Sequence, residues 1–230
     1  MPEPSENLAY QSNLEALVQA RTEQLRSVIL DLERSYDTVL EVLGKALGLK
    51  DAPTLAHSRR VTAFSISLAR TLGLPREDIS VLGRAAFLHD IGMLGVPDAI
   101  LNKTSKLTPH EYAVVKQHCW HGYELARMIP FMHEAAEIVH AHQERFNGTG
   151  YPRGLKGEEI PMGARVIAVV DALDAITFDR PYRAAKVLGA AKEEIQRCAG
   201  KQFDPWVVEV FMKMPDHIWE DLAKEVASAN

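Results

Sequence analysis

Apolar residues recur at a helical spacing near the start of the chain. They stand about 3.5 residues apart between residues 14 and 42, with polar residues between them: Leu14, Val18, Leu25, Val28, Leu32 and Val39. This pattern predicts a long amphipathic helix with a seam suited to a partner helix, although Arg21 and Ser35 interrupt the seam. Two interpretations stay open. The helix folds back on its own domain, or it forms a parallel dimeric coiled coil that relays a signal from an upstream module.

After Gly48, turn signals divide the chain into shorter helices, and no stretch shows the sustained alternation of a β-strand. The Thr108–Glu111 segment reads as a capping box at the start of a helix that carries His118. We expect further helices around His57 and over 75–92, 131–144, 163–177, 182–199, 205–212 and 216–227. Residues 147–162, rich in glycine and proline, are expected to be irregular. The predicted fold class is all-α, with a signalling or dimerisation helix over 1–45 and a globular domain over 46–230.

Composition narrows the function classes. The 230 residues have a net charge of -5, which argues against DNA binding because a DNA-binding face is basic. No apolar run approaches the roughly 20 residues that cross a bilayer, and no signal peptide is visible, so we expect a cytoplasmic protein without membrane association. The cysteines, Cys119 and Cys198, form no CxxC pair. We expect them to be reduced and partly buried, and structural zinc on thiolates is disfavoured.

The adjacent pair His89-Asp90 carries the strongest chemical signal. It follows Ala85–Leu88, so the carboxylate is expected to be buried, where an unpaired charge is costly. A buried salt bridge or an interaction with a helix C-terminus would also account for the pair. As a metal site, however, the imidazole and carboxylate could share one ion while the second carboxylate oxygen reaches a neighbouring ion.

Other histidines leave choices that the sequence alone does not decide. His57 lies on an apolar helical face, where a histidine is more often a satisfied core residue than a ligand. His118 and His121 share a helical face, so either could be a ligand. His140 and His142 point in nearly opposite directions, so only one of them faces inward.

Asp171 interrupts an apolar helix, where its charge needs a metal, a cation or hydrogen bonds. Asp174, one turn later, could support a ligand instead of being one. Histidines and carboxylates on several apolar helices together indicate one internal site with nitrogen and oxygen ligands. Such ligands suit iron, manganese or zinc.

Several motifs resemble those of the HD-GYP family, the cyclic di-GMP phosphodiesterase branch of the HD metal-dependent phosphohydrolase superfamily. The similarity extends over about residues 46–211. The matching segments are His89–Gly92, Pro97–Leu101, His142–Pro152, Ile160–Pro161, Ala164–Val166, Asp171–Ala175, Asp179–Arg183 and Phe203–Pro205. The preceding helix resembles the linker that joins a receiver domain to this module. The resemblance implies an HD-superfamily helical bundle.

The resemblance also implies two divalent metal ions, iron or manganese, and hydrolysis of cyclic di-GMP to pGpG or GMP. One ion would be held by His57, His89, Asp90 and Asp171, and the second by Asp90, His118 and His142. Asp90 would be the catalytic residue, and Arg180, Arg183 and Tyr151 would bind the substrate. Expected partners are a second copy through the N-terminal helix and a receiver, sensor or GGDEF-type module.

The chain departs from the family pattern where the second metal ion would bind. Gln143 stands in place of an adjacent histidine, and Met93 in place of a lysine. Pro53 replaces a glutamate that is associated with a third ion, so we expect two ions at most, and Asn147 replaces an aspartate. Gln143, Met93 and Pro53 point to a rival hypothesis, ranked a little below the hydrolase, in which a degenerate module binds cyclic di-GMP or a protein partner without hydrolysis. A hydrolase acting on other nucleotides or on phosphomonoesters is a third, weaker interpretation.

Overall fold

The computed structural model describes residues 4–50, 53–179 and 184–228. The chain forms two compact units, Met1–Val42 and Leu43–Asn230. Each unit is described by itself.

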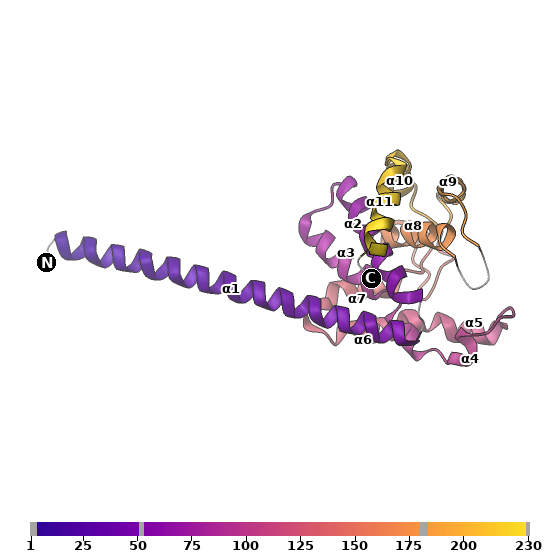
Figure 1. Ribbon diagram of the computed structural model, residues 1–230, viewed down its shortest axis with the longest axis horizontal. Helices are drawn as coiled ribbons and strands as arrows, with labels where there is room; N and C mark the ends of the chain where they lie inside the picture. Colours follow the sequence, from indigo (N-terminus) through magenta and orange to yellow (C-terminus); the bar gives the residue numbers. More distant parts are fainter. Residues whose placement is uncertain (1–3, 51–52, 180–183, 229–230) are drawn as a thin grey trace. The chain divides into compact units, whose positions relative to one another are not determined.

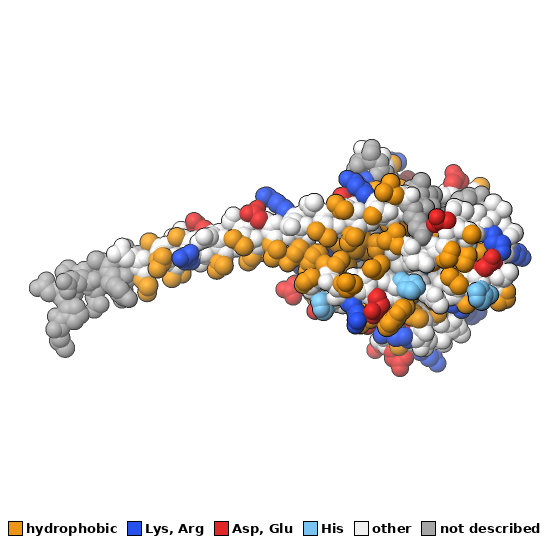
Figure 2. Space-filling model, turned by 90° about the horizontal axis from the view of Figure 1, so that it is seen from below, with side chains coloured by type: hydrophobic (Ala, Val, Ile, Leu, Met, Phe, Trp, Pro, Cys, Tyr) orange, Lys and Arg blue, Asp and Glu red, His pale blue; other side chains and the backbone are white. Residues whose placement is uncertain are grey.

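The long helix α1 spans Pro4–Lys50. Its residues up to Val42 make up the described part of the first unit, and its residues from Leu43 belong to the second unit. The prediction of a long N-terminal helix is confirmed, and the helix extends beyond both predicted ends. The six seam residues are between 42% and 62% exposed, and apolar side chains form a row along this helix in Figure 2. Burying such a row against a partner helix would stabilise the pairing of the two helices. Dimerisation through α1 stays a prediction.

The regular elements in the described part of the second unit are helices, joined by turns and irregular segments (Figure 1). Two isolated β-bridges, Asn147 to Lys156 and Ala199 to Phe203, are the β-pairings described. After α1, the α-helices are α2 (Pro53–Thr71), α3 (Arg76–Leu88), α4 (Asp98–Leu101), α5 (Pro109–Lys116), α6 (His118–Arg127), α7 (His133–Ala141), α8 (Met162–Thr177), α9 (Leu188–Arg197), α10 (Pro205–Lys213) and α11 (Asp216–Ser228). Three short 3-10 helices are η1 (Ile91–Gly95), η2 (Pro130–Met132) and η3 (Gly157–Glu159). The predicted all-α class is confirmed.

Helix α8 occupies the centre of this unit. It packs against α2, α3, α7, α9 and α10, and Val166, Ile167, Val169 and Val170 are completely buried. Because the helix is apolar on most of its circumference, it is stable only inside the bundle. A polar residue on α8 is therefore held at a fixed position within the core.

Three predicted helix boundaries are wrong. The helix predicted over 75–92 ends at Leu88, and a 3-10 helix begins at Ile91. The helix that starts at Thr108 ends at Lys116, so His118 begins a separate helix. In the described part of 182–199, residues 184–187 are not helical, and α9 begins at Leu188.

One close backbone approach explains the first boundary. A Cβ atom on Gly92 would lie 1.9 Å from the carbonyl oxygen of His118. Glycine is therefore required where η1 packs against α6. Because α3 ends at Leu88, Gly92 can make this contact. The contact places Asp90 beside His118.

Within the described residues, no helix has both the length and the apolar character needed to span a membrane.

Candidate metal centre

Six polar side chains from five segments converge inside the second unit: His57, His89, Asp90, His118, His142 and Asp171. The four histidines are at most 5% exposed. The side chains of Asp90 and Asp171 remain 25% and 29% exposed, respectively. The imidazoles thus form the inner wall of the cluster, and the carboxylates face its more open side.

Three of the histidines are oriented by the same local contact. His89, His118 and His142 each follow the last turn of a helix, α3, α5 and α7 respectively. Each Nδ1 lies within hydrogen-bond distance of the carbonyl oxygen three residues earlier, at 2.7, 2.7 and 2.6 Å. Carbonyl groups in the last turn of a helix lack their full set of helical donors and can accept these bonds. Since a carbonyl only accepts, each Nδ1 donates, and each Nε2 faces the cluster.

His57 is oriented by a carboxylate instead. Its Nδ1 lies 2.6 Å from Oδ2 of the fully buried Asp174. Arg60 Nε donates to the other oxygen of Asp174 at 2.5 Å. Asp174 therefore has the supporting position that the sequence analysis left open, and it directs His57 Nε2 toward the cluster.

Asp90 lies between two pairs of imidazoles. Its Oδ2 is 3.3 Å from His89 Nε2 and 3.8 Å from His57 Nε2. Its Oδ1 is 3.7 Å from His118 Nε2 and 3.8 Å from His142 Nε2. Each oxygen of Asp90 thus faces a different pair of imidazoles, as expected of a carboxylate that bridges two ions.

Within each pair, the two Nε2 atoms approach closely. They are 3.3 Å apart for His57 and His89, and 3.1 Å apart for His118 and His142. Because every Nδ1 is committed as a donor, two neutral rings would direct lone pairs at each other. A proton or a metal cation between them removes this repulsion, so the donor set fits two cations, one per pair.

Charges in the cluster shift the pKa values of its members. Burial lowers the pKa of His89, but the charge of Asp90 and its hydrogen bond outweigh burial and raise that pKa to about 9. Burial and the neighbouring His118 and His89 lower the pKa of His142 to about 3. Burial alone would raise the pKa of Asp90, yet the facing histidines hold it well below its usual value. The site thus combines an anionic carboxylate with a neutral imidazole at His142, which is a metal-binding combination.

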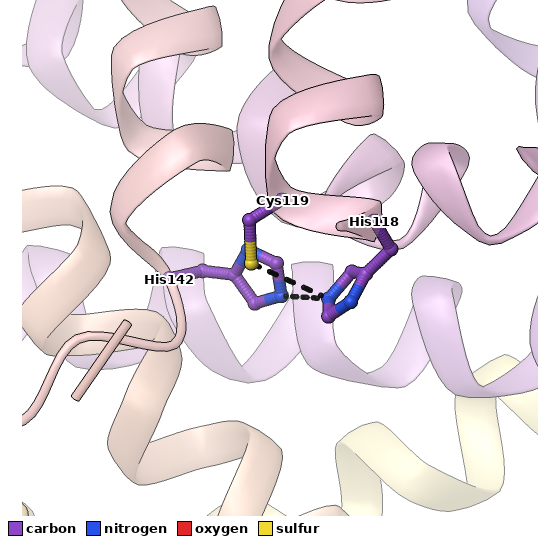
Figure 3. A group of neighbouring side chains, drawn as sticks. All are labelled: His118, Cys119 and His142. Atoms are coloured by element: carbon purple, nitrogen blue, oxygen red, sulfur yellow. Dashed lines mark hydrogen bonds between the residues drawn. The ribbon is translucent and has the colours of Figure 1, made fainter. Parts of the chain in front are cut away.

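The second pair has a sulfur beside it. Cys119 Sγ lies 3.6 Å from His118 Nε2, and Cys119, His118 and His142 offer ligand atoms that all lie within 4.8 Å of one another. In Figure 3, dashed lines join the sulfur of Cys119 and Nε2 of His142 to the same atom, Nε2 of His118. Burial raises the pKa of the Cys119 thiol, and the charges of Asp90 and Glu144 raise it further. A metal ion bound there would have to displace the thiol proton.

The glycine-rich loop after α7 covers one side of the site. Glu144 is buried, and its carboxylate accepts hydrogen bonds from the backbone N–H groups of Arg153 at 2.7 Å and Leu155 at 3.1 Å. These bonds fix the loop so that the Tyr151 ring lies 6.3 Å from the His118 ring, centroid to centroid. Lys116 Nζ lies over the rings of Tyr112 and Tyr151, at 4.8 and 5.1 Å.

Two pockets adjoin the cluster. The smaller, about 140 Å³, includes Tyr151, Lys116, Gln143 and Asp171 in its lining. The larger, about 700 Å³, includes Asp171, Lys186 and Arg197. Asp171 borders both pockets, so a ligand in either one would reach the carboxylate side of the cluster.

The predicted site residues can now be located. All six predicted metal ligands are brought together, and Tyr151 lies beside them. Arg180 and Arg183 lie outside the described residues. The structure also selects between the histidines: His118 and His142 face the cluster, whereas His140 stacks on Tyr123 with ring centroids 4.7 Å apart.

Four contributors were not identified from the sequence: Arg60, Lys116, Cys119 and Glu144. Arg60 acts through Asp174, which is distant in sequence, and Glu144 acts through backbone N–H groups of the following loop; no residue pattern in the sequence indicates either pairing. The sequence predicts for Cys119 a reduced, partly buried thiol, because it belongs to no CxxC pair. Its position next to His118, a predicted ligand, like that of Asp90 next to His89, was the available signal.

Comparison with known proteins agrees with the fold. The family model described as "HD domain" matches residues 41–207. The match covers more than half of the chain, and the chain belongs to the HD domain family. The predicted family resemblance is confirmed.

Among curated proteins, the chain is 39% identical over 189 residues to a cyclic di-GMP phosphodiesterase of Thermotoga maritima, covering 81% of this chain and 51% of that protein. It is 45% identical over 174 residues to the cyclic di-GMP phosphodiesterase PA4108 of Pseudomonas aeruginosa, covering 73% and 40%. It is 36% identical over 177 residues to the 3'3'-cGAMP-specific phosphodiesterase 3 of Vibrio cholerae, covering 76% and 38%. The chain thus spans about half or less of these relatives.

Among solved structures, the fold is similar to that of a cyclic GMP-AMP-specific phosphodiesterase of V. cholerae, V-cGAP3. The TM-score is 0.63 at 21% identity, and the similarity covers 82% of this chain and 52% of that one. At this identity the likeness concerns the fold alone, and it supports the HD-superfamily helical bundle predicted from the sequence.

Proposed function

We propose that this chain is a metal-dependent phosphodiesterase domain that hydrolyses cyclic di-GMP to pGpG or GMP. The observation that carries the proposal is the position of Asp90, which directs one oxygen to each of two imidazole pairs. A two-cation centre of this form suits in-line attack on a phosphodiester. Relatives named cyclic di-GMP phosphodiesterases supply the substrate class.

The proposed ligands form two sets that share Asp90. His57, His89 and Asp171 complete the first set, and His118 and His142 complete the second. Iron or manganese bound there would polarise a phosphoryl oxygen and lower the pKa of a bound water. Asp174 holds His57, and helix-end carbonyls hold the other histidines, so the chain fixes the ligand directions before an ion binds.

The substrate would lie along the pockets that border Asp171. Lys116, over the Tyr112 and Tyr151 rings, offers a cation toward a phosphate, and the Tyr151 ring offers an apolar face. Arg180 and Arg183, proposed from the family resemblance, would contribute further guanidinium groups. The family's motif lysine is Met93 here, so Lys116 would provide a positive charge from a different helix.

The direct test is product formation by the purified chain loaded anaerobically with Fe²⁺ or with Mn²⁺. We expect cyclic di-GMP to be converted to pGpG or GMP, and Asp90→Ala to abolish the conversion. The comparison substrate in the same assay is the dinucleotide 3'3'-cGAMP, because one relative is named for it. Absence of product under both metal loadings would overturn the hydrolase proposal.

The alternative is a module that binds cyclic di-GMP or a protein partner without cleaving it. The presence of Gln143 favours it, because an amide stands where the resemblance expects a second imidazole. Calorimetry beside the product assay separates the two functions: heat of binding without conversion favours the module. In either case, we propose that residues 1–45 form a homodimerising helix and link the 46–230 domain to a receiver, sensor or GGDEF-type module.

A further inference from the structure

Outside the predicted ligand set, one buried group points at the metal centre: the thiol of Cys119. It is 0% exposed and belongs to a three-residue group with His118 and His142 whose potential ligand atoms lie within 4.8 Å of one another (Figure 3). The other cysteine, Cys198, is half-buried beside Glu194. The two cysteines of the chain are therefore in different environments.

Two distances in this group are close to those expected around a common tetrahedral cation. A tetrahedral ion with metal–nitrogen bonds of about 2.0 Å and a metal–sulfur bond of about 2.3 Å separates two nitrogens by about 3.3 Å and nitrogen from sulfur by about 3.5 Å. The two Nε2 atoms are 3.1 Å apart, and Sγ lies 3.6 Å from His118 Nε2. Asp90 Oδ1, at 3.7 and 3.8 Å from the two Nε2 atoms, would be the fourth ligand.

The sulfur also lies next to the residue that departs from the family pattern. The backbone N–H of Gln143 is a hydrogen-bond donor to the Cys119 sulfur. Gln143 itself offers a neutral amide, which is a poor ligand for a divalent ion beside imidazoles. The chain thus places a potential sulfur ligand beside the backbone of the residue at which it lacks the expected imidazole.

We propose that Cys119 is a direct ligand of the second metal ion and completes, with Asp90, His118 and His142, a site of one sulfur, two nitrogens and one oxygen. This inference rests on the proposed two-metal centre. When the ion binds, the metal–sulfur bond forms, the S–H bond breaks, and the proton leaves to the buffer. A thiolate ligand shifts the preference of this site from manganese toward zinc, cobalt and iron.

The test is a titration of the metal-free full chain with Co²⁺, followed by absorption spectroscopy. A sulfur-to-cobalt charge-transfer band in the near ultraviolet is expected as the second ion binds. Cys119→Ser should remove the band and weaken binding of the second ion by more than the roughly 10–100-fold typical of losing an outer-shell partner, because a direct ligand is lost. Cys198→Ala is the matched control, and it should retain the band.

The wild-type and Cys198→Ala spectra decide the question even if Cys119→Ser does not fold, since Cys198→Ala leaves Cys119 as the single thiol of the chain. Two bound Co²⁺ ions without the band would overturn the sulfur ligand while leaving the two-metal centre and the proposed hydrolysis intact. Retention of the band in a folded Cys119→Ser protein would also overturn it. Conversely, a band without cyclic di-GMP turnover would support the ligand and contradict the hydrolase.

Discussion

His57 Nδ1 lies 2.6 Å from Oδ2 of Asp174, a carboxylate with no exposed surface, one helical turn after Asp171 on α8. Helix α8 thus supplies both a proposed ligand and the group that orients the histidine facing that ligand. Arg60 on α2 compensates the charge of Asp174. Burial would raise the pKa of Asp174, but hydrogen bonds from His57 and Arg60 lower it.

The first prediction concerns this orientation. Asp174→Asn removes the anion that holds the Nδ1 proton of His57, so affinity for the first metal ion should fall about 10–100-fold. Isothermal titration of the metal-free protein measures the change. Asp221→Asn, which alters an exposed ion pair with Lys224, should leave affinity unchanged. Equal affinities in wild type and Asp174→Asn would show that Asp174 has no part in orienting the ligand.

The second prediction concerns the contact between η1 and α6. Alanine at position 92 would bring a Cβ within 1.9 Å of the His118 carbonyl oxygen, so Gly92→Ala should lower the free energy of unfolding by about 3 kcal/mol or more. Gly189→Ala is the matched control, because nothing lies within 4 Å of its added Cβ. Thermal denaturation of both variants is the measurement, and similar small changes in the two would refute the steric account.

The third prediction is a pH dependence at the start of α5. A hydrogen bond from Lys103, followed by bonds from the backbone and side chain of Thr108, lowers the pKa of Glu111 from 4.5 to about 2. A depressed folded-state pKa stabilises the fold above the ordinary pKa, and this stabilisation is lost as pH falls toward about 2. Glu111→Gln should therefore be less stable than wild type at neutral pH, and the gap should close below pH 4.5. A gap that stays constant in chemical denaturation across this range would contradict the assignment.

The fourth prediction concerns metal removal. Because the imidazole pairs need a cation or proton between them, divalent ions should bind the folded state and raise its stability, by about 2.7 kcal/mol at 100 times the dissociation constant. Chelation should lower the melting temperature of wild type. The Asp90→Ala protein should show a much smaller response to both addition and chelation. If the melting temperature of wild type were the same with added metal and after chelation, a metal site specific to the folded state would be ruled out.

Much of the fold follows from local sequence signals. The capping box is present as predicted, since Thr108 Oγ1 accepts from the Glu111 backbone N–H at 3.2 Å. The breaks at Leu88 and Lys116 were not predicted, because neither residue is directly followed by a proline or glycine. They depend on tertiary packing, in particular on the approach of Gly92 to His118. Sequence periodicity does not contain that information.

The sequence predicted which residue types form the site, but not which of the neighbouring side chains point into it. Helical spacing could not choose between His118 and His121, because the choice depends on how α6 is rotated against η1 and α7. The same holds for His140, which instead stacks on Tyr123. Cys119 directly follows the proposed ligand His118, and only the three-dimensional structure shows that its sulfur lies within 4.8 Å of the ring nitrogens of His118 and His142.

The bridging role of Asp90 is tested most directly by counting bound metal. Wild type, His57→Ala, His118→Ala and Asp90→Ala should be dialysed anaerobically against Fe²⁺ and analysed for metal per chain. We expect two ions in wild type, one in each histidine variant, and neither ion held tightly in Asp90→Ala, because each Asp90 oxygen faces a different pair. If Asp90→Ala retained as many ions as either histidine variant, Asp90 would not be shared and the two-metal centre would be contradicted.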